Sequence, residues 1–223
     1  MGGGRFLVMI TIPLEKVRTL LVVGAHADDI EIGCGGTILE IARSRPEINI
    51  RWVVFSADES RAKEARQSAD DFLSDFKSRQ VQLHAFTDGF YPAEWSEIKQ
   101  VFEKLKHSIQ PDLILTHYGQ DLHQDHRLIS ELTWNTFRDH LILEYEIPKY
   151  DGDLGNPNLY MPVAEELCRK KIDLLLRNFP SQANKPWFDR ELFQALMRLR
   201  GMECTAPERY AEAFYARKAC LSP

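Results

Sequence analysis

Short apolar runs alternate with longer amphipathic stretches over the first half of the chain, and this alternation constrains the fold most. Four runs rich in apolar residues predict strands, at residues 20–25, 48–55, 81–86 and 112–116. Between them, residues 37–44, 61–77 and 95–109 predict helices, the last two with apolar residues at helical spacing. This order is typical of βαβ units. We therefore expect an α/β fold with a mostly parallel sheet and helices on both faces.

The second half of the chain is less regular. Residues 141–147 favour a fifth strand, and residues 151–158 have the composition of a loop. Residues 164–178 and 190–200 predict helices, whereas residues 210–217 fit either a strand or a helix. No repeat or linker interrupts the chain. We expect one domain over residues 1–223, in which residues 1–18 form an N-terminal extension, partly flexible.

Composition and charge exclude several classes of protein. The 223-residue chain is 44% hydrophobic, enough for a core, and its net charge of −5 argues against nucleic-acid binding. The apolar run 6–12 is too short to span a membrane, and no cleavage site follows it. The widely spaced cysteines predict buried thiols in a reducing compartment. We expect a cytoplasmic protein without membrane or nucleic-acid partners. The cysteines are Cys34, Cys168, Cys204 and Cys220.

A first cluster of polar residues directly follows the first predicted strand. His26, Asp28 and Asp29 stand there, ahead of the glycine-rich sequence 33–36. A surface turn with an Asp helix cap needs only one of these carboxylates, so the cluster favours a functional site. The glycines lack the G-x-G-x-x-G spacing, which argues against a dinucleotide site. They fit a tight turn and close helix–sheet packing better.

A second cluster follows the fourth predicted strand. Residues 116–127 contain His117, His123 and His126 together with Asp121 and Asp125, in what we expect to be a loop. Ligands bind outside the carboxyl ends of the strands in an open parallel sheet, so both clusters fall where a ligand crevice is expected. Histidine with carboxylate suits zinc and, less selectively, iron, cobalt or manganese. Two histidines and one aspartate with an open position are typical of a hydrolytic metal site.

The two clusters resemble the signatures of a known family. Residues 25–29, Ala-His-Ala-Asp-Asp, resemble the A-H-P-D-D signature of the PIG-L/LmbE-like metal-dependent N-deacetylases, the N-acetylglucosaminyl deacetylase type. Residues 123–126, His-Gln-Asp-His, resemble the second signature, H-x-D-H. Weaker similarity extends from about residue 19 to 217. The resemblance implies a Rossmann-like sheet with the metal at the carboxyl ends of its strands, and substrates that are N-acetylated amino sugars, often glucosamine glycosides.

The resemblance also implies a ligand set for the metal. His26, Asp29 and His126 would hold Zn²⁺, although Fe²⁺ or another divalent metal fits the same donors. Asp125 would hydrogen-bond one of the two histidines and fix its tautomer. A homo-oligomer is expected only from the family.

Three further residues receive roles in substrate chemistry from the resemblance. Asp28 would be the general base for the metal-bound water, and His123 the general acid or oxyanion partner. Arg61 would bind substrate hydroxyls. The loop 151–158, Tyr118 and Trp187 are further candidates to face a sugar.

The chain departs from the family pattern at a few positions. Ala27 replaces the usual proline, from which we expect a modest effect. Ile30 stands where many relatives have Glu, and Glu31 follows it, for which we expect a backbone or cap role. His117 and Asp121 are additional polar residues, expected behind the metal ligands or on the surface.

The leading hypothesis is an amide hydrolase that removes an acetyl group from an amino sugar of the N-acetylglucosamine type. Hydrolysis of another amide or an ester on the same metal site, or a deaminating hydrolase, is the alternative within enzymes. A non-catalytic metal or sugar binder would keep ligands without acid–base residues, but Asp28 and His123 are present. A nucleotide-binding α/β protein is the remaining alternative.

Overall fold

The structure, a computed structural model, describes residues 11–220 and contains one mixed sheet. Within these residues the sheet has seven strands in the order β3-β2-β1-β4-β5-β7-β6. The first five strands in that order are parallel, whereas β7 runs antiparallel to both β5 and β6. The strands are β1 (Thr19–His26), β2 (Asn49–Ser56), β3 (Ser78–Leu83), β4 (Leu113–His117), β5 (Leu141–Tyr145), β6 (Leu159–Val163) and β7 (Tyr210–Ala216).

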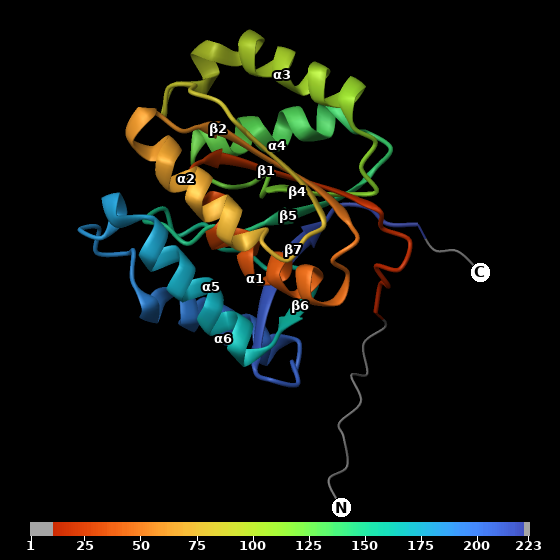
Figure 1. Cartoon of the computed structure of the whole chain (residues 1–223), viewed down its shortest axis with the longest axis vertical. Coiled ribbons are helices and arrows are strands. Elements are labelled where there is room, and N and C mark those ends of the chain that lie inside the picture. Colours follow the sequence, from red (N-terminus) through yellow and green to blue (C-terminus); the bar gives the residue numbers. More distant parts are fainter. Residues whose placement is uncertain (1–10, 221–223) are drawn as a thin grey trace, which may run out of the picture.

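Helices cover both faces of this sheet, as predicted (Figure 1). One face carries α3 and α4, and the other carries α1, α2, α5 and α6. Each face has its own core, because side chains alternate along the strands: in β1, Val22 packs into one core and Val23 into the other. The helices are α1 (Asp29–Ser44), α2 (Glu59–Phe72), α3 (Trp95–Ser108), α4 (Gln124–Thr136), α5 (Glu165–Asn178) and α6 (Arg190–Glu203).

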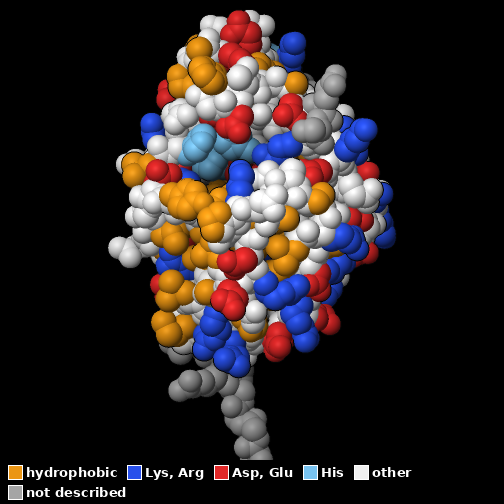
Figure 2. All heavy atoms as spheres, turned by 90° about the vertical axis from the view of Figure 1, so that its left-hand side faces the viewer, with side chains coloured by type: hydrophobic (Ala, Val, Ile, Leu, Met, Phe, Trp, Pro, Cys, Tyr) orange, Lys and Arg blue, Asp and Glu red, His pale blue; other side chains and the backbone are white. Residues whose placement is uncertain are grey.

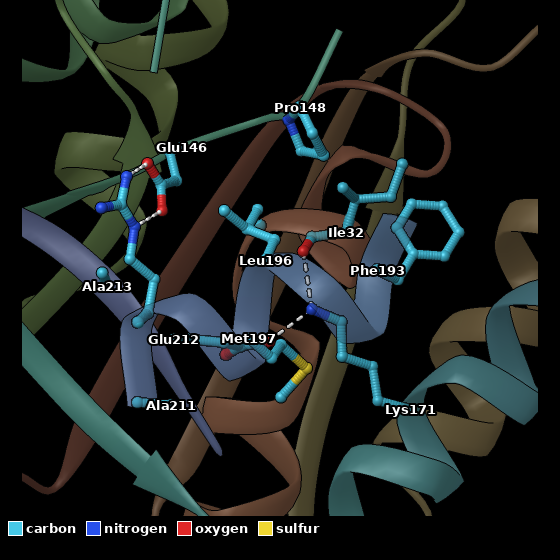
Figure 3. A pocket seen from close by; sticks show the side chains of 12 residues that line it. Ile32, Glu146, Pro148, Lys171, Phe193, Leu196, Met197, Ala211, Glu212 and Ala213 are labelled. Carbon is cyan, nitrogen blue, oxygen red and sulfur yellow. Dashed lines mark hydrogen bonds and ion pairs between the residues drawn. The ribbon is translucent and has the colours of Figure 1, made fainter. Parts of the chain in front are cut away.

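Helix α1 is broken near its middle, and a buried ion pair bridges the break. Cys34 has a non-helical backbone conformation there. In a regular helix the Gly36 N–H would donate to the Ile32 carbonyl. Instead it donates to Glu212 at 2.8 Å, while the Ile32 oxygen accepts from Lys171 Nζ at 2.7 Å (Figure 3). Lys171 and Glu212 are themselves 2.6 Å apart. The first half of α1, which begins at Asp29, is thereby fixed relative to α5 and β7.

Several predictions about local structure were wrong in their limits. Helix α1 begins at Asp29, not at residue 37, and α2 ends at Phe72 instead of residue 77. Residues 124–136 form α4, so His126 lies on a helix and not in the expected loop. Strand β6 was not predicted. The undecided segment near the end is strand β7. Its backbone pairs with two neighbouring strands, a long-range choice that the local pattern does not contain.

The described residues do not include either end of the chain. Residues 1–10 and 221–223, with most of the expected N-terminal extension 1–18 and of the apolar run 6–12, lie outside the described residues. Val17, within that expected extension, is buried in the core.

All four cysteines are free thiols, and only Cys220 is exposed. Among the described residues, no helix has both the length and the apolar character needed to cross a membrane.

Candidate metal and catalytic site

The two polar clusters meet at the carboxyl ends of β1 and β4. His26 is the last residue of β1, and Asp29, three positions later, is the first residue of α1. His123 is the N-cap of α4, and His126 lies in the first turn of that helix. Because β1 and β4 are adjacent and parallel, residues 100 positions apart in the chain face one another. Figure 2 shows histidine side chains gathered in a hollow of the surface.

His26, Asp29 and His126 place one donor atom each at the corners of a small triangle. His26 Nδ1 lies 3.2 Å from Asp29 Oδ2 and 3.2 Å from His126 Nε2. His126 Nε2 is 3.5 Å from Asp29 Oδ2. Tetrahedral zinc, with ligands at about 2.0–2.1 Å, separates its donor atoms by about 3.3–3.4 Å. The three residues therefore fit a divalent cation in both donor chemistry and spacing.

Charges around this triangle favour a cation at its centre. Although burial opposes the charged imidazole, Asp29, Asp125 and Asp88 raise the pKa of His26 well above its ordinary value. Burial likewise opposes ionisation of Asp29, yet His126 and His26 lower its pKa well below the ordinary value. A positive charge on the imidazole of His26 thus compensates the carboxylates here, as a divalent cation would.

Other donor sets overlap with this triangle. Among the described residues, His26, His123 and His126 also lie close enough to share an ion, as do Asp29, His117 and His126. His117 is a poor ligand, because its Nε2 accepts the Ala25 N–H at 2.9 Å. Burial, followed by His126, lowers the pKa of His117 to about 4, so its ring is neutral. Its ring stacks on that of His126, with centroids 4.1 Å apart.

A carboxylate lies behind each candidate histidine ligand. His26 Nε2 is 3.2 Å from Oδ2 of Asp125, the residue expected to hydrogen-bond one of the two histidines. His126 Nδ1 is 2.9 Å from Asp121 Oδ2, a contact that sequence reasoning did not predict. Asp121 is buried, so of the two places expected for it the surface is excluded. A carboxylate on the outer nitrogen fixes the tautomer of a metal-binding imidazole.

The backbone of residues 88–91 also contacts this cluster, and no sequence signal indicated it. The N–H groups of Gly89 and Tyr91 donate to the two carboxylate oxygens of Asp125, at 2.6 and 3.2 Å. Asp88 Oδ1 lies 3.0 Å from His26 Nε2. A single aspartate in a turn is too common a feature to mark a site. Only the path of the chain after β3 places Asp88 beside His26.

Asp28 and Arg61 form an ion pair beside the triangle. Arg61 Nη2 lies 3.0 Å from Asp28 Oδ1, and the Asp28 side chain is largely buried. Although burial opposes the charge, Asp28 raises the pKa of Arg61. Arg61, expected to contact substrate hydroxyls, therefore contacts the candidate general base in this structure. Asp28 makes no side-chain cap to α1, which leaves its carboxylate for other chemistry.

The side chain of His123 is half-buried, and its ring lies beside the rings of His26 and His126. Its ring centroid is 5.0 Å from that of His26 and 4.6 Å from that of His126. Its Nδ1 accepts the N–H of Asp125 at 3.3 Å, so the neutral ring carries its proton on Nε2. Burial, with His126 and His26, lowers the pKa of His123. Nε2 is then a hydrogen-bond donor at neutral pH.

Solved structures with the same fold include proteins of different activity. N,N′-diacetylchitobiose deacetylase from Pyrococcus horikoshii has a TM-score of 0.67 at 18% identity, covering 92% of this chain and 85% of its own. The conserved protein TT1542 from Thermus thermophilus has a TM-score of 0.70 at 20% identity, covering 92% and 96%. GalB, the 4-carboxy-2-hydroxymuconate hydratase from Pseudomonas putida, has a TM-score of 0.68 at 16% identity, covering 92% and 98%. At these identities the likeness concerns the fold.

A family model provides the assignment that the fold alone does not. The PIG-L model, described as GlcNAc-PI de-N-acetylase, matches residues 21–137, more than half of the chain. The match contains β4, all but the first two residues of β1, and both polar clusters. This chain therefore belongs to the PIG-L family.

Proposed function

We propose that the chain is a zinc-dependent hydrolase that removes the acetyl group from an N-acetylated amino sugar of the N-acetylglucosamine type. The observation that carries the proposal is the triangle of His26 Nδ1, Asp29 Oδ2 and His126 Nε2, with separations of 3.2–3.5 Å. Membership of the PIG-L family supports the reaction, and the chitobiose deacetylase with the same fold supports the sugar. Iron or another divalent metal would fit the same donors.

The bound metal would polarise the acetyl carbonyl and lower the pKa of water. Asp28 would accept the proton of the water that attacks the carbonyl carbon. The Arg61 guanidinium, 3.0 Å away, would hold that carboxylate in place. As the C–N bond breaks, the amine nitrogen gains a proton and leaves, and acetate is the second product.

His123 would act on the other side of the reacting carbonyl. Its Nε2–H, fixed by the Asp125 N–H on Nδ1, would stabilise the oxyanion or pass a proton to the departing amine. Asp121 and Asp125 would not touch the substrate. They would keep the imidazoles of His126 and His26 in the tautomer that offers a lone pair toward the cation.

The test measures amine and acetate released from N-acetylglucosamine and its glycosides by the purified chain, loaded in turn with Zn²⁺ and Fe²⁺. Asp28→Asn is expected to retain the metal and to lose about 10²–10⁴-fold in kcat. A binding protein on the same fold would release no amine in either form. Release from other N-acyl amines but not from amino sugars would point to a different amide.

A further inference from the structure

An apolar groove opens beside the candidate metal site. Its volume is about 440 Å³, within the range of small-molecule sites. One wall is the loop after β5, and the other is the start of α6 with the segment before it. Figure 2 shows hydrophobic surface next to the hollow that holds the histidines. The apolar residues of the groove are Pro148, Tyr150, Leu154, Pro186, Trp187 and Leu192.

The loop after β5, which forms one wall of the groove, is hydrogen-bonded to residues of the candidate metal site. Lys149 Nζ lies 2.8 Å from Asp121 Oδ2, the oxygen that contacts His126 Nδ1. Lys149 also pairs with Asp153, whose carboxylate accepts the Leu122 N–H at 2.7 Å. One residue, Lys149, therefore contributes both to the groove and to the contacts behind a candidate ligand. The groove is therefore connected to the candidate metal site through Lys149, Asp121 and His126.

The lining favours an apolar occupant over a second sugar. Tyr150 is 76% exposed and Leu154 is 42% exposed, so both present apolar surface to solvent. The two charged residues of the groove already have partners: Lys149 binds Asp121 and Asp153, and Asp189 accepts the Leu192 N–H at 2.8 Å. Sugar hydroxyls would find few free partners here, whereas an aromatic ring or a short alkyl chain would need none.

We propose that this apolar groove binds an aromatic or short alkyl group carried by the amino-sugar substrate. This proposal rests on the proposed function, because it takes the metal site as the place where the acetyl group reacts. The enzyme would then prefer glycosides with an apolar aglycone over the free sugar or its methyl glycoside.

The test compares phenyl and methyl glycosides of N-acetylglucosamine, in both anomeric forms, with the full-length metal-loaded chain. The ratio of kcat/KM, phenyl over methyl, is expected to be about tenfold for one anomer, as burial of roughly 60 Å² of apolar surface provides. Tyr150→Ser and Leu154→Ser should each reduce this ratio by about threefold or more, because each substitution removes apolar contact with the aglycone. Circular dichroism checks that both variants fold.

Met202→Ser is the matched control. Met202 is also an exposed apolar residue, 59% accessible, and it lies on α6 outside the groove. This variant should keep the ratio of the unmodified chain. Equal kcat/KM for the two glycosides, or a ratio unchanged in both groove variants, would overturn the proposal. So would a preference for N,N′-diacetylchitobiose over the phenyl glycoside, because that result indicates a sugar subsite.

Calorimetric binding of the phenyl and methyl glycosides separates this proposal from the proposed function, because binding does not require turnover. Tighter binding of the phenyl glycoside that weakens in Tyr150→Ser, without amine release from any substrate, would support the groove and contradict the deacetylase. Amine release without any aglycone preference would support the deacetylase and contradict the groove.

Discussion

His126 Nδ1 lies 2.9 Å from Asp121 Oδ2, and Lys149 binds the same oxygen at 2.8 Å. Although burial opposes ionisation, His126 and Lys149 lower the pKa of Asp121 well below its ordinary value. The carboxylate is therefore ionised at every pH at which the chain would work. It holds the proton of His126 on Nδ1 and leaves Nε2, the atom in the triangle with His26 and Asp29, for a cation.

Asp121→Asn should therefore weaken metal binding. We expect the dissociation constant for Zn²⁺ to rise by about 10–100-fold, the usual effect of removing an orienting carboxylate. Competition with a chromophoric chelator measures it. Asp70→Asn, at an exposed position on α2, is the control and should leave the affinity unchanged. An unchanged affinity in Asp121→Asn would show that the contact does not orient the ligand.

Arg61 is expected to act through Asp28, which it contacts at 3.0 Å, and a double-mutant cycle tests this. Arg61→Met should lower kcat by about 10-fold or more in the unmodified chain, because the carboxylate loses its fixed position. In the Asp28→Asn background, Arg61→Met should lower kcat only slightly further. If the two losses instead multiply, Arg61 contacts the substrate independently, as the sequence resemblance implies.

The ion pair at the break in α1 predicts a strong effect on stability. Lys171→Met removes one member of a buried pair and leaves Glu212 and the Ile32 carbonyl without that donor. We expect a loss of about 3–5 kcal/mol in the free energy of unfolding, measured by urea denaturation. The neighbouring Lys170 is the control: its pair with Asp75, 3.5 Å apart, is solvent-exposed, so Lys170→Met should cost at most about 1 kcal/mol.

Glu31 predicts a pH dependence of stability. Burial raises the pKa of its carboxyl from an ordinary value of 4.5 to about 8, with Ser68 only partly opposing the shift. Between these values the folded chain holds a proton that the unfolded chain has lost. The contribution of Glu31 to the free energy of unfolding is therefore fully present below pH 4.5. It decreases by about 1.4 kcal/mol per pH unit as the pH rises to 8.

Glu31→Gln should remove this contribution. The variant should therefore gain stability relative to the unmodified chain as pH rises from 5 to 8, measured by urea unfolding at each pH. Glu97→Gln, at an exposed position on α3, should show a constant difference over the same range. A constant difference for Glu31→Gln as well would show that its carboxyl is ionised in the folded chain.

Local sequence pattern was informative where burial is continuous. The parallel strands β1, β2 and β4 are covered on both faces, so they consist of apolar runs that stand out from their surroundings. Helix α4 was missed because its first turn is polar: Gln124, Asp125, His126 and Arg127 have the composition of a loop. The same turn carries candidate site residues, and their chemistry hid the helical pattern. Strand β6 is only partly buried and contains Pro162, which weakens a strand signal.

The sequence by itself determined that two polar clusters follow buried strands, and adjacent parallel strands bring such clusters to one edge of a sheet. Only the tertiary structure decided which groups pair there. Asp121 contacts His126, Asp125 contacts His26, and Arg61 forms an ion pair with Asp28. Such pairings depend on where strands, loops and helix ends lie in space, and the contacts from Asp125 to His26 and from Glu212 to Gly36 join residues 99 and 176 positions apart. No pattern within a local window specifies contacts over such distances, because packing of the whole sheet sets them.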